Sequence, residues 1–308
     1  MSIAYDLAGI ETRVHSDSID LTRMRVPNLV GLDSGMVQID YADLTHHDGD
    51  RVVCMERQDH LEFVAPAGQY DRCGTIFYLA ELAAEQKRQL HGGAMLHAAG
   101  VYLPGSERGI LILGEKGSGK TSIAIGLCMG AEGQLVGNDQ VVLASYDKSV
   151  QLLDGSKDIH IRRTAAIQDP TLMSLATFTD KEKPNWDNKK TVSPEQAGIK
   201  EAQFAPKVTD VIQVIIDRTL EKTTVLRERR DTQTLLFITE KISRHIRGVA
   251  TPILNNDGVF DAFSPSLDTP ETAANRAALV NTILGIGVTK IYAPSTDAMV
   301  EAIMGYYG

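Results

Sequence analysis

The glycine-rich stretch GEKGSGKTS at 114–122 constrains the fold of this chain more than any other feature. It follows the apolar run GILIL and precedes the apolar run IAIGL, and it satisfies the pattern G-x-x-x-x-G-K-[ST]. The glycines let the backbone bend around a phosphate, and the first turn of the following helix adds N–H donors and the positive end of its dipole. The stretch therefore predicts a phosphate-binding loop between a buried strand and a helix.

The residue types in the loop predict its ligand. Lys120 would place a compact positive charge against the β- and γ-phosphates, and the Thr121 hydroxyl would bind Mg²⁺. Because such a loop contacts phosphates and largely ignores the base, we expect either ATP or GTP, with Mg²⁺. The expected nucleotide contacts are Gly114, Glu115, Lys116, Gly117, Ser118, Gly119, Lys120, Thr121 and Ser122.

A second motif, GND at 137–139, suggests how the metal is held. Asp139 comes only 19 positions after Lys120, directly behind the first helix. In most ATPases and GTPases with this loop, the strand that ends in an aspartate comes after further secondary structure. We therefore expect Asp139 on the neighbouring strand, within reach of Mg²⁺; the alternative is an aspartate in a turn.

These segments resemble the HPr kinase/phosphorylase superfamily. The resemblance rests on LHAAGVYL, GILILGEKGSGKTSIAIGL and LVGNDQVVL, covers residues 94–143 specifically, and does not include the N-terminal part. It implies an α/β kinase domain whose fold is also similar to that of phosphoenolpyruvate carboxykinases. It further implies Mg²⁺-dependent phosphoryl transfer from ATP or another phosphate donor to a hydroxyl, typically of serine.

The resemblance also implies roles for individual residues. Lys120 and Thr121 match the phosphate lysine and the metal-binding hydroxyl, and His97 matches a histidine of the preceding strand, either near the phosphates or as a structural histidine. The family has paired aspartates where this chain has Asn138 and Asp139. Only Asp139 can supply a carboxylate, so either another residue shares its work or transfer is weak or lost. Asn138 could still position an acceptor. The glycine-rich C-terminal signature of genuine HPr kinases is missing, which argues against HPr as the substrate.

Further cations would be needed for charge on the transferred phosphoryl group. Arg162 is favoured over Arg163 at the end of the segment DIHIRR, and Lys189 and Lys190 lie in a long polar tract at 178–198. This tract, which includes Trp186, is interpreted as a lid or substrate loop.

The rest of the chain predicts two unequal parts. Residues 1–73 consist of short extended segments, indicating a small β-rich module, probably antiparallel by their spacing in the sense that hairpins are expected, with HHDGD at 46–50 as a solvated turn. The periodic apolar residues of 74–92 predict a connecting helix. Residues 93–308 alternate strands and helices, as expected for the α/β catalytic domain.

Composition narrows the environment and the partners. The net charge is -9, which opposes binding to nucleic acid, and no apolar run approaches a membrane span. The three cysteines lack metal-site spacing. The N-terminus lacks signal-peptide features, so we expect a cytoplasmic protein. The family's tendency to assemble implies a homo-oligomer.

Three functions are compatible with these observations. The first is a Mg-ATP-dependent kinase acting on a hydroxyl of a peptide, protein or small molecule. The second is a nucleotide-responsive binding module without catalysis, which Asn138 keeps open. The third is a nucleoside triphosphatase whose hydrolysis drives a conformational change.

Overall fold

The chain forms a mixed α/β structure with two compact units. The computed structural model describes residues 1–7, 9–23, 29–30, 40–179, 188–228, 231–249 and 251–307. The first unit comprises Met1–Gly31, Gly35–Met95 and Leu236–Asn281, and the second is built mainly of Leu96–Leu235 and Thr282–Gly308. Within the described ranges, no helix is both long and apolar enough to cross a membrane.

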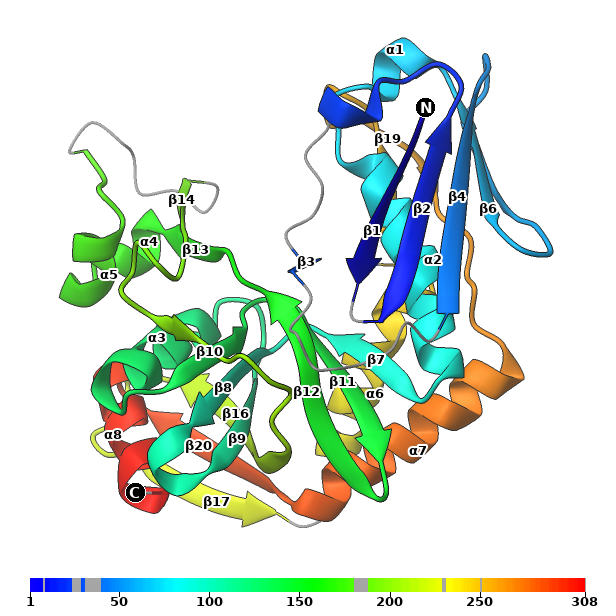
Figure 1. Cartoon of the computed structure of the whole chain (residues 1–308). Helices are drawn as coiled ribbons and strands as arrows, with labels where there is room; N and C mark the ends of the chain where they lie inside the picture. The colour runs from blue at the N-terminus through cyan, green and yellow to red at the C-terminus, as the bar shows by residue number, and fades with distance from the viewer. Residues whose placement is uncertain are drawn as a thin grey trace. The chain divides into compact units, whose positions relative to one another are not determined.

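A five-stranded sheet forms the centre of the first unit, in the order β1-β2-β4-β6-β5 (Figure 1). Its strands are β1 (Ser2–Leu7), β2 (Ile10–Ser16), β4 (Asp40–Asp48), β5 (Val53–Glu56) and β6 (Leu61–Ala65). In β2, β4 and β6 buried and less buried residues alternate, as expected for strands with one face in a core.

The predicted antiparallel hairpins are only partly present. β1 pairs with β2 and β5 pairs with β6 in antiparallel fashion, but β2–β4 and β4–β6 are parallel pairs. β5 comes between β4 and β6 in the chain and lies at the sheet edge, so β6 returns beside β4 in the same direction. Strand spacing in the sequence does not reveal such an inserted edge strand.

The helix α2 (Thr75–Leu90) has the predicted bounds but not the predicted connecting role. Ile76, Phe77, Leu79 and Ala80 are fully buried, and the helix contacts β2, β4 and β6. It ends next to Gly92, whose φ of 76° is a conformation that glycine adopts without steric cost. The helix thus supplies half of the core of the first unit.

The histidine cluster at 46–50 departs from the expected solvated turn. His46 and His47 lie within β4, and His46 is fully buried. Its Nε2 is 3.1 Å from the Ala65 carbonyl oxygen, so it donates there, and the Ser16 hydroxyl donates to Nδ1 at 2.9 Å. His46 is a paired core residue, whereas His47 is exposed and contacts Asp17.

The first unit is completed by elements from later in the chain. These are η1 (Leu21–Arg23), α1 (Ala67–Tyr70), most of α6 (Thr232–Ile246), the hairpin of β18 (Pro252–Leu254) and β19 (Phe260–Phe263), and most of α7 (Pro270–Ile286). Ile238, Ile242 and Ile246 recur every four residues on α6 and are fully buried, because this spacing keeps them on one helix face.

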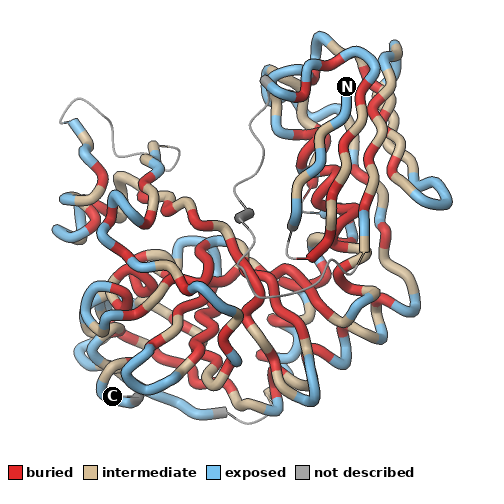
Figure 2. Tube along the Cα trace, in the orientation of Figure 1, coloured by how far each residue is buried: buried red, intermediate tan, exposed pale blue. Residues whose placement is uncertain are grey.

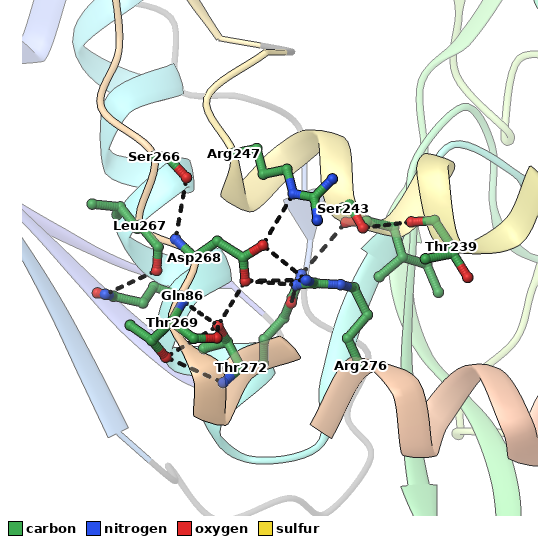
Figure 3. Close-up of polar contacts among 12 residues, drawn as sticks. Gln86, Thr239, Ser243, Arg247, Ser266, Leu267, Asp268, Thr269, Thr272 and Arg276 are labelled. Carbon is green, nitrogen blue, oxygen red and sulfur yellow. Dashed lines mark hydrogen bonds and ion pairs between the residues drawn. The ribbon is translucent and has the colours of Figure 1, made fainter. Parts of the chain in front are cut away.

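A buried charge cluster centred on Asp268 joins these elements (Figure 3). The Asp268 carboxylate accepts hydrogen bonds from Arg276 at 2.8 Å, from Arg247 at 3.0 Å and from the Thr272 hydroxyl at 3.0 Å. Arg276 is 4% exposed and also donates to Gln89 of α2 at 2.7 Å. The cluster links the last turn of α6, the first turns of α7 and α2 within the first unit.

The second unit is built on a seven-stranded sheet in the order β15-β10-β8-β9-β16-β20-β17. The central strands β9, β16 and β20 are parallel, and β8 is antiparallel to β9. The strands are β8 (Ala99–Leu103), β9 (Arg108–Leu113), β10 (Gln134–Gly137), β15 (Lys200–Glu201), β16 (Val208–Ile216), β17 (Thr224–Glu228) and β20 (Val288–Ala293).

The helices α3 (Lys120–Gly130) and α8 (Thr296–Tyr307) pack against each other and against this sheet. Ile123 and Leu127 of α3 share a core with Ile112 of β9, Ile212 of β16 and Ile303 of α8. Buried residues, red in Figure 2, follow the strands, while exposed residues concentrate in turns. This core fixes the strand and the helix that flank the glycine-rich loop.

The second unit also carries two antiparallel strand pairs outside the main sheet. These are β11 (Val141–Tyr146) with β12 (Ser149–Ser156), and β13 (Ile159–Arg162) with β14 (Lys189–Val192). The other described elements are β3 (Leu29–Val30), β7 (Gly93–Leu96), η2 (Pro104–Ser106), α4 (Arg163–Ala166) and α5 (Pro170–Leu175).

The compact units divide the chain differently from the linear boundaries 1–73, 74–92 and 93–308. The reason is that 236–281 packs with the N-terminal sheet and α2 through contacts such as Asn275 to the carbonyl of Leu90 at 3.0 Å. In the tract 178–198, the segment 189–192 forms β14, and 180–187, including Trp186, lies outside the described residues.

Asp268→Ala should lower the free energy of unfolding by about 3 kcal/mol, because it leaves the buried Arg276 guanidinium without its carboxylate. Arg247→Ala removes another partner of the same carboxylate, but its side chain is 53% exposed, so a loss below about 1 kcal/mol is expected. Urea unfolding of both variants measures the difference. Equal losses would contradict a buried, mutually dependent pair.

Stability should fall as the pH drops through about 6.5, the ordinary pKa of histidine, because burial lowers the pKa of His46. The unfolded state then binds a proton that the folded state excludes, so stability is lost from that pH downward toward the lower folded pKa. Urea unfolding between pH 8 and pH 5 should show a smaller slope for His46→Gln. The exposed His15→Gln serves as the control and should keep the wild-type slope; indistinguishable slopes for His46→Gln and wild type would refute the assignment.

Candidate functional site

The glycine-rich loop joins the end of β9 to the start of α3. Gly117 and Gly119 both have φ of 85°, a left-handed conformation that glycine adopts readily. A Cβ atom at Gly114 would lie 2.2 Å from Ser118 Oγ, so the loop folds back on itself more closely than any other residue at 114 would permit. The pattern of glycines is thus explained by the local backbone.

Lys120 points back into the loop. It is 7% exposed, and its Nζ donates to the carbonyl oxygens of Gly114 at 3.0 Å and Glu115 at 3.1 Å. No side chain caps the N-terminus of α3, since the preceding residue is Gly119. The loop therefore brings an ammonium group and the positive end of a helix together, which suits a phosphate group.

Asn138, rather than Asp139, contacts the loop helix. Asn138 is 2% exposed and follows β10, and its Oδ1 accepts the Thr121 hydroxyl proton at 2.9 Å. Its Nδ2 donates to the Asp158 carbonyl oxygen at 3.2 Å. The structure therefore brings together the two residues that the sequence assigned to the metal side and to the acceptor side.

Asp139 lies in the turn between β10 and β11 and pairs with His97. Its φ is 71°, a left-handed conformation that aspartate and asparagine tolerate better than most residues. The Asp139 Oδ1 is 3.1 Å from His97 Nδ1, and the two side chains are 51% and 34% exposed. His97 lies in the short break between β7 and β8 rather than on a strand, as was expected.

Arg162 occupies the last position of β13, as predicted, directly opposite Lys189 of β14. Arg163 begins α4, and its guanidinium lies 6.0 Å from the Phe178 ring centroid, with Lys190 Nζ at 5.8 Å from the same ring. The basic residues singled out in the sequence thus share one small strand pair, whose first strand starts next to the Asn138 contact at Asp158.

Lys157 was not identified from the sequence. It is 4% exposed, its Nζ donates to the Val136 carbonyl oxygen, and it lies 3.7 Å from Asp154 Oδ1. Burial lowers its pKa, and the Asp154 carboxylate opposes that effect. An isolated lysine in DGSKD carries no periodic signal; only the paired glycines on either side of the β10–β12 contact could have indicated a close backbone approach there.

Magnesium fits the residues at the loop. Among the residues that the structure describes, no group of three or more His, Cys, Asp or Glu side chains could hold a metal ion. Mg²⁺ in nucleotide sites needs no such group, because it keeps several waters and takes phosphate oxygens with one or two protein ligands. Thr121 suits this chemistry, since its hydroxyl proton is directed to Asn138 and its oxygen lone pairs remain for a cation.

The comparisons with known proteins show one distant structural relationship. No protein-family model matches the chain, and no curated protein is significantly similar to it. Among solved structures, the HPr(Ser) kinase/phosphatase from Coxiella burnetii is similar, with 12% identity and a TM-score of 0.31. The match covers 70% of this chain and 99% of that chain. This level of likeness does not establish a shared activity.

Lys120→Ala should weaken the binding of nucleoside triphosphate by at least about tenfold, because it removes the one ammonium group that the loop holds at the start of α3. Titration with a fluorescent ATP analogue measures the affinity. Lys222→Ala, at an exposed position of the second unit, is the control for a loss of one positive charge. Unchanged affinity in Lys120→Ala would show that the loop does not bind the phosphates.

Proposed function

We propose that this chain is a Mg-ATP-dependent kinase that transfers the γ-phosphoryl group to a hydroxyl. The observation that carries the proposal is the Thr121–Asn138 hydrogen bond, because it holds the GND turn against the first turn of the loop helix. A phosphate-binding loop and a carboxylate from the adjacent residue, Asp139, are thereby kept in one region of the second unit.

The loop would hold the triphosphate. Backbone N–H groups of 114–119 and the start of α3 would receive the phosphate oxygens, and Lys120 would exchange its two carbonyl partners for the β- and γ-phosphates. Bound Mg²⁺ would neutralise charge on the phosphates. GTP would fit the same contacts, since none of them reads the base.

Asp139 would take the proton of the acceptor hydroxyl. As the acceptor oxygen forms its bond to the γ-phosphorus, the bond from that phosphorus to the β–γ bridging oxygen breaks and ADP leaves with that oxygen. The proton passes to the Asp139 carboxylate and then to solvent. His97, at 3.1 Å, would hold this carboxylate in place.

The acceptor would approach from solution. The Asp139 side chain is half exposed although its backbone is fixed between two strands. This accessibility suits a serine-type hydroxyl on a peptide or protein, or a small alcohol. Arg162, at the end of β13, is the further cation we propose for the phosphoryl group.

A nucleotide-responsive module without catalysis is the second candidate. It is favoured by the amide of Asn138, which contacts Thr121 where paired carboxylates would be expected for a kinase. In that case nucleotide would bind through the same loop and remain intact.

Asp139→Asn should reduce label transfer from γ-labelled ATP to hydroxyl acceptors by about 100-fold or more, because an amide cannot accept the proton. The acceptors to test are serine-containing peptides and small alcohols. Asparagine tolerates the left-handed backbone at 139, so the fold should be kept.

A matched control exists in the same unit. Asp147→Asn makes the same chemical change at an exposed turn residue that also has positive φ, at 46°, and should leave transfer unchanged. Full transfer by Asp139→Asn would rule out its role as base. Release of free phosphate alone by the wild type would indicate a triphosphatase, and intact bound nucleotide would indicate the binding module.

A further inference from the structure

Both ends of the Asn138 amide are used. Oδ1 accepts from the Thr121 hydroxyl at 2.9 Å, and Nδ2 donates to the Asp158 carbonyl oxygen at 3.2 Å. The residue is 2% exposed, so these contacts are shielded from water and fix the direction of the amide. Asparagine is required here, because a carboxylate has no proton to donate to Asp158 and would set two acceptor oxygens against each other.

The contact determines how Thr121 can bind a cation. A hydroxyl has one proton, and that of Thr121 is committed to Asn138. The oxygen lone pairs are then directed elsewhere, which is the arrangement that a hydroxyl ligand of Mg²⁺ needs. Groups that orient a metal ligand in this way commonly raise metal affinity 10- to 100-fold without touching the metal.

Residues 154–158, here called the strap, hold Asn138 from the other side. The Asn138 N–H donates to the Ser156 carbonyl at 2.7 Å, and the Ser156 N–H donates to the Gln140 carbonyl at 2.9 Å. Gly137 and Gly155 allow this approach, since a Cβ on either one would lie 2.5 Å from the Cα of the other. The strap thus pairs with the GND turn at backbone contact distance.

Lys157 anchors the strap to β10. A buried ammonium group is costly unless it has partners, and Lys157 has the Val136 carbonyl oxygen as a hydrogen-bond acceptor and Asp154 Oδ1 at 3.7 Å. Val136 comes directly before Gly137, so the anchor lies two residues from Asn138. Lys157 contacts neither Thr121 nor the glycine-rich loop in these hydrogen bonds and acts through the backbone.

We propose that Asn138 is a positioning residue that directs the Thr121 hydroxyl toward the metal of a bound Mg-nucleotide, and that the strap sets its position through Lys157. This inference rests on the proposed binding of a nucleoside triphosphate. It assigns to Asn138 a role on the metal side instead of contact with the acceptor.

The test compares nucleotide affinity with and without metal. A fluorescent ATP analogue is titrated into the full chain in Mg²⁺ and in EDTA, and the ratio of the two dissociation constants measures the gain due to the metal. Asn138→Ala and Asn138→Asp should lower that ratio about tenfold, while affinity in EDTA stays within about threefold of wild type. Lys157→Met should lower the ratio less, and exposed Lys222→Met should not change it.

The outcomes separate this inference from the proposed function. Absence of any binding by the wild type would overturn both. A metal gain in the wild type that persists in Asn138→Ala would overturn the positioning role alone, as would a larger gain in Asn138→Asp, which would indicate direct metal binding at 138. If thermal unfolding shows that Asn138→Ala is not folded, Asn138→Ser and Lys157→Met provide the same comparison.

Discussion

The hydrogen bond from Thr121 to Asn138 connects three parts of the second unit that are separate in the sequence. It joins the first turn of α3 to the end of β10, and Asn138 in turn contacts the segment before β13. The glycine-rich loop by itself defines a place for phosphate groups. Only this bond places the carboxylate and the histidine of the turn region near that place, and it depends on an amide that has both an acceptor and a donor.

The same rule holds in the first unit, where no catalytic role is proposed. Glu85 of α2 is fully buried and accepts from the Met95 N–H at 3.0 Å and from Gln89 at 2.7 Å, with Arg88 as a further partner. Gln89 also receives Arg276, which binds Asp268. Each buried charge is thus shared with the next element, so the polar contacts specify which helices and segments meet, while the apolar residues provide most of the burial.

Local patterns in the sequence were sufficient for several elements. The apolar stripe predicted α2 with its observed bounds, and the glycine pattern predicted a loop between a strand and α3. Pairing partners were not predictable in this way. Two adjacent histidines followed by Asp-Gly suggested a turn, yet β4 continues through His46 because Ser16 and Ala65, distant in the sequence, satisfy its ring. For the same reason Asn138 was read as a weakened aspartate, since its partner at Asp158 is revealed only by the fold, and Lys157 gave no signal at all.

The positive φ of Asp139 restricts which residues can replace it. At such a position asparagine and glycine are tolerated, whereas β-branched and bulky residues are strained. Codons for aspartate and asparagine differ by one base. Under the proposed function, a single base change would therefore convert a phosphotransferase into a nucleotide-binding protein with the same fold, so a lineage carrying this turn could gain or lose catalysis without first passing through an unstable protein.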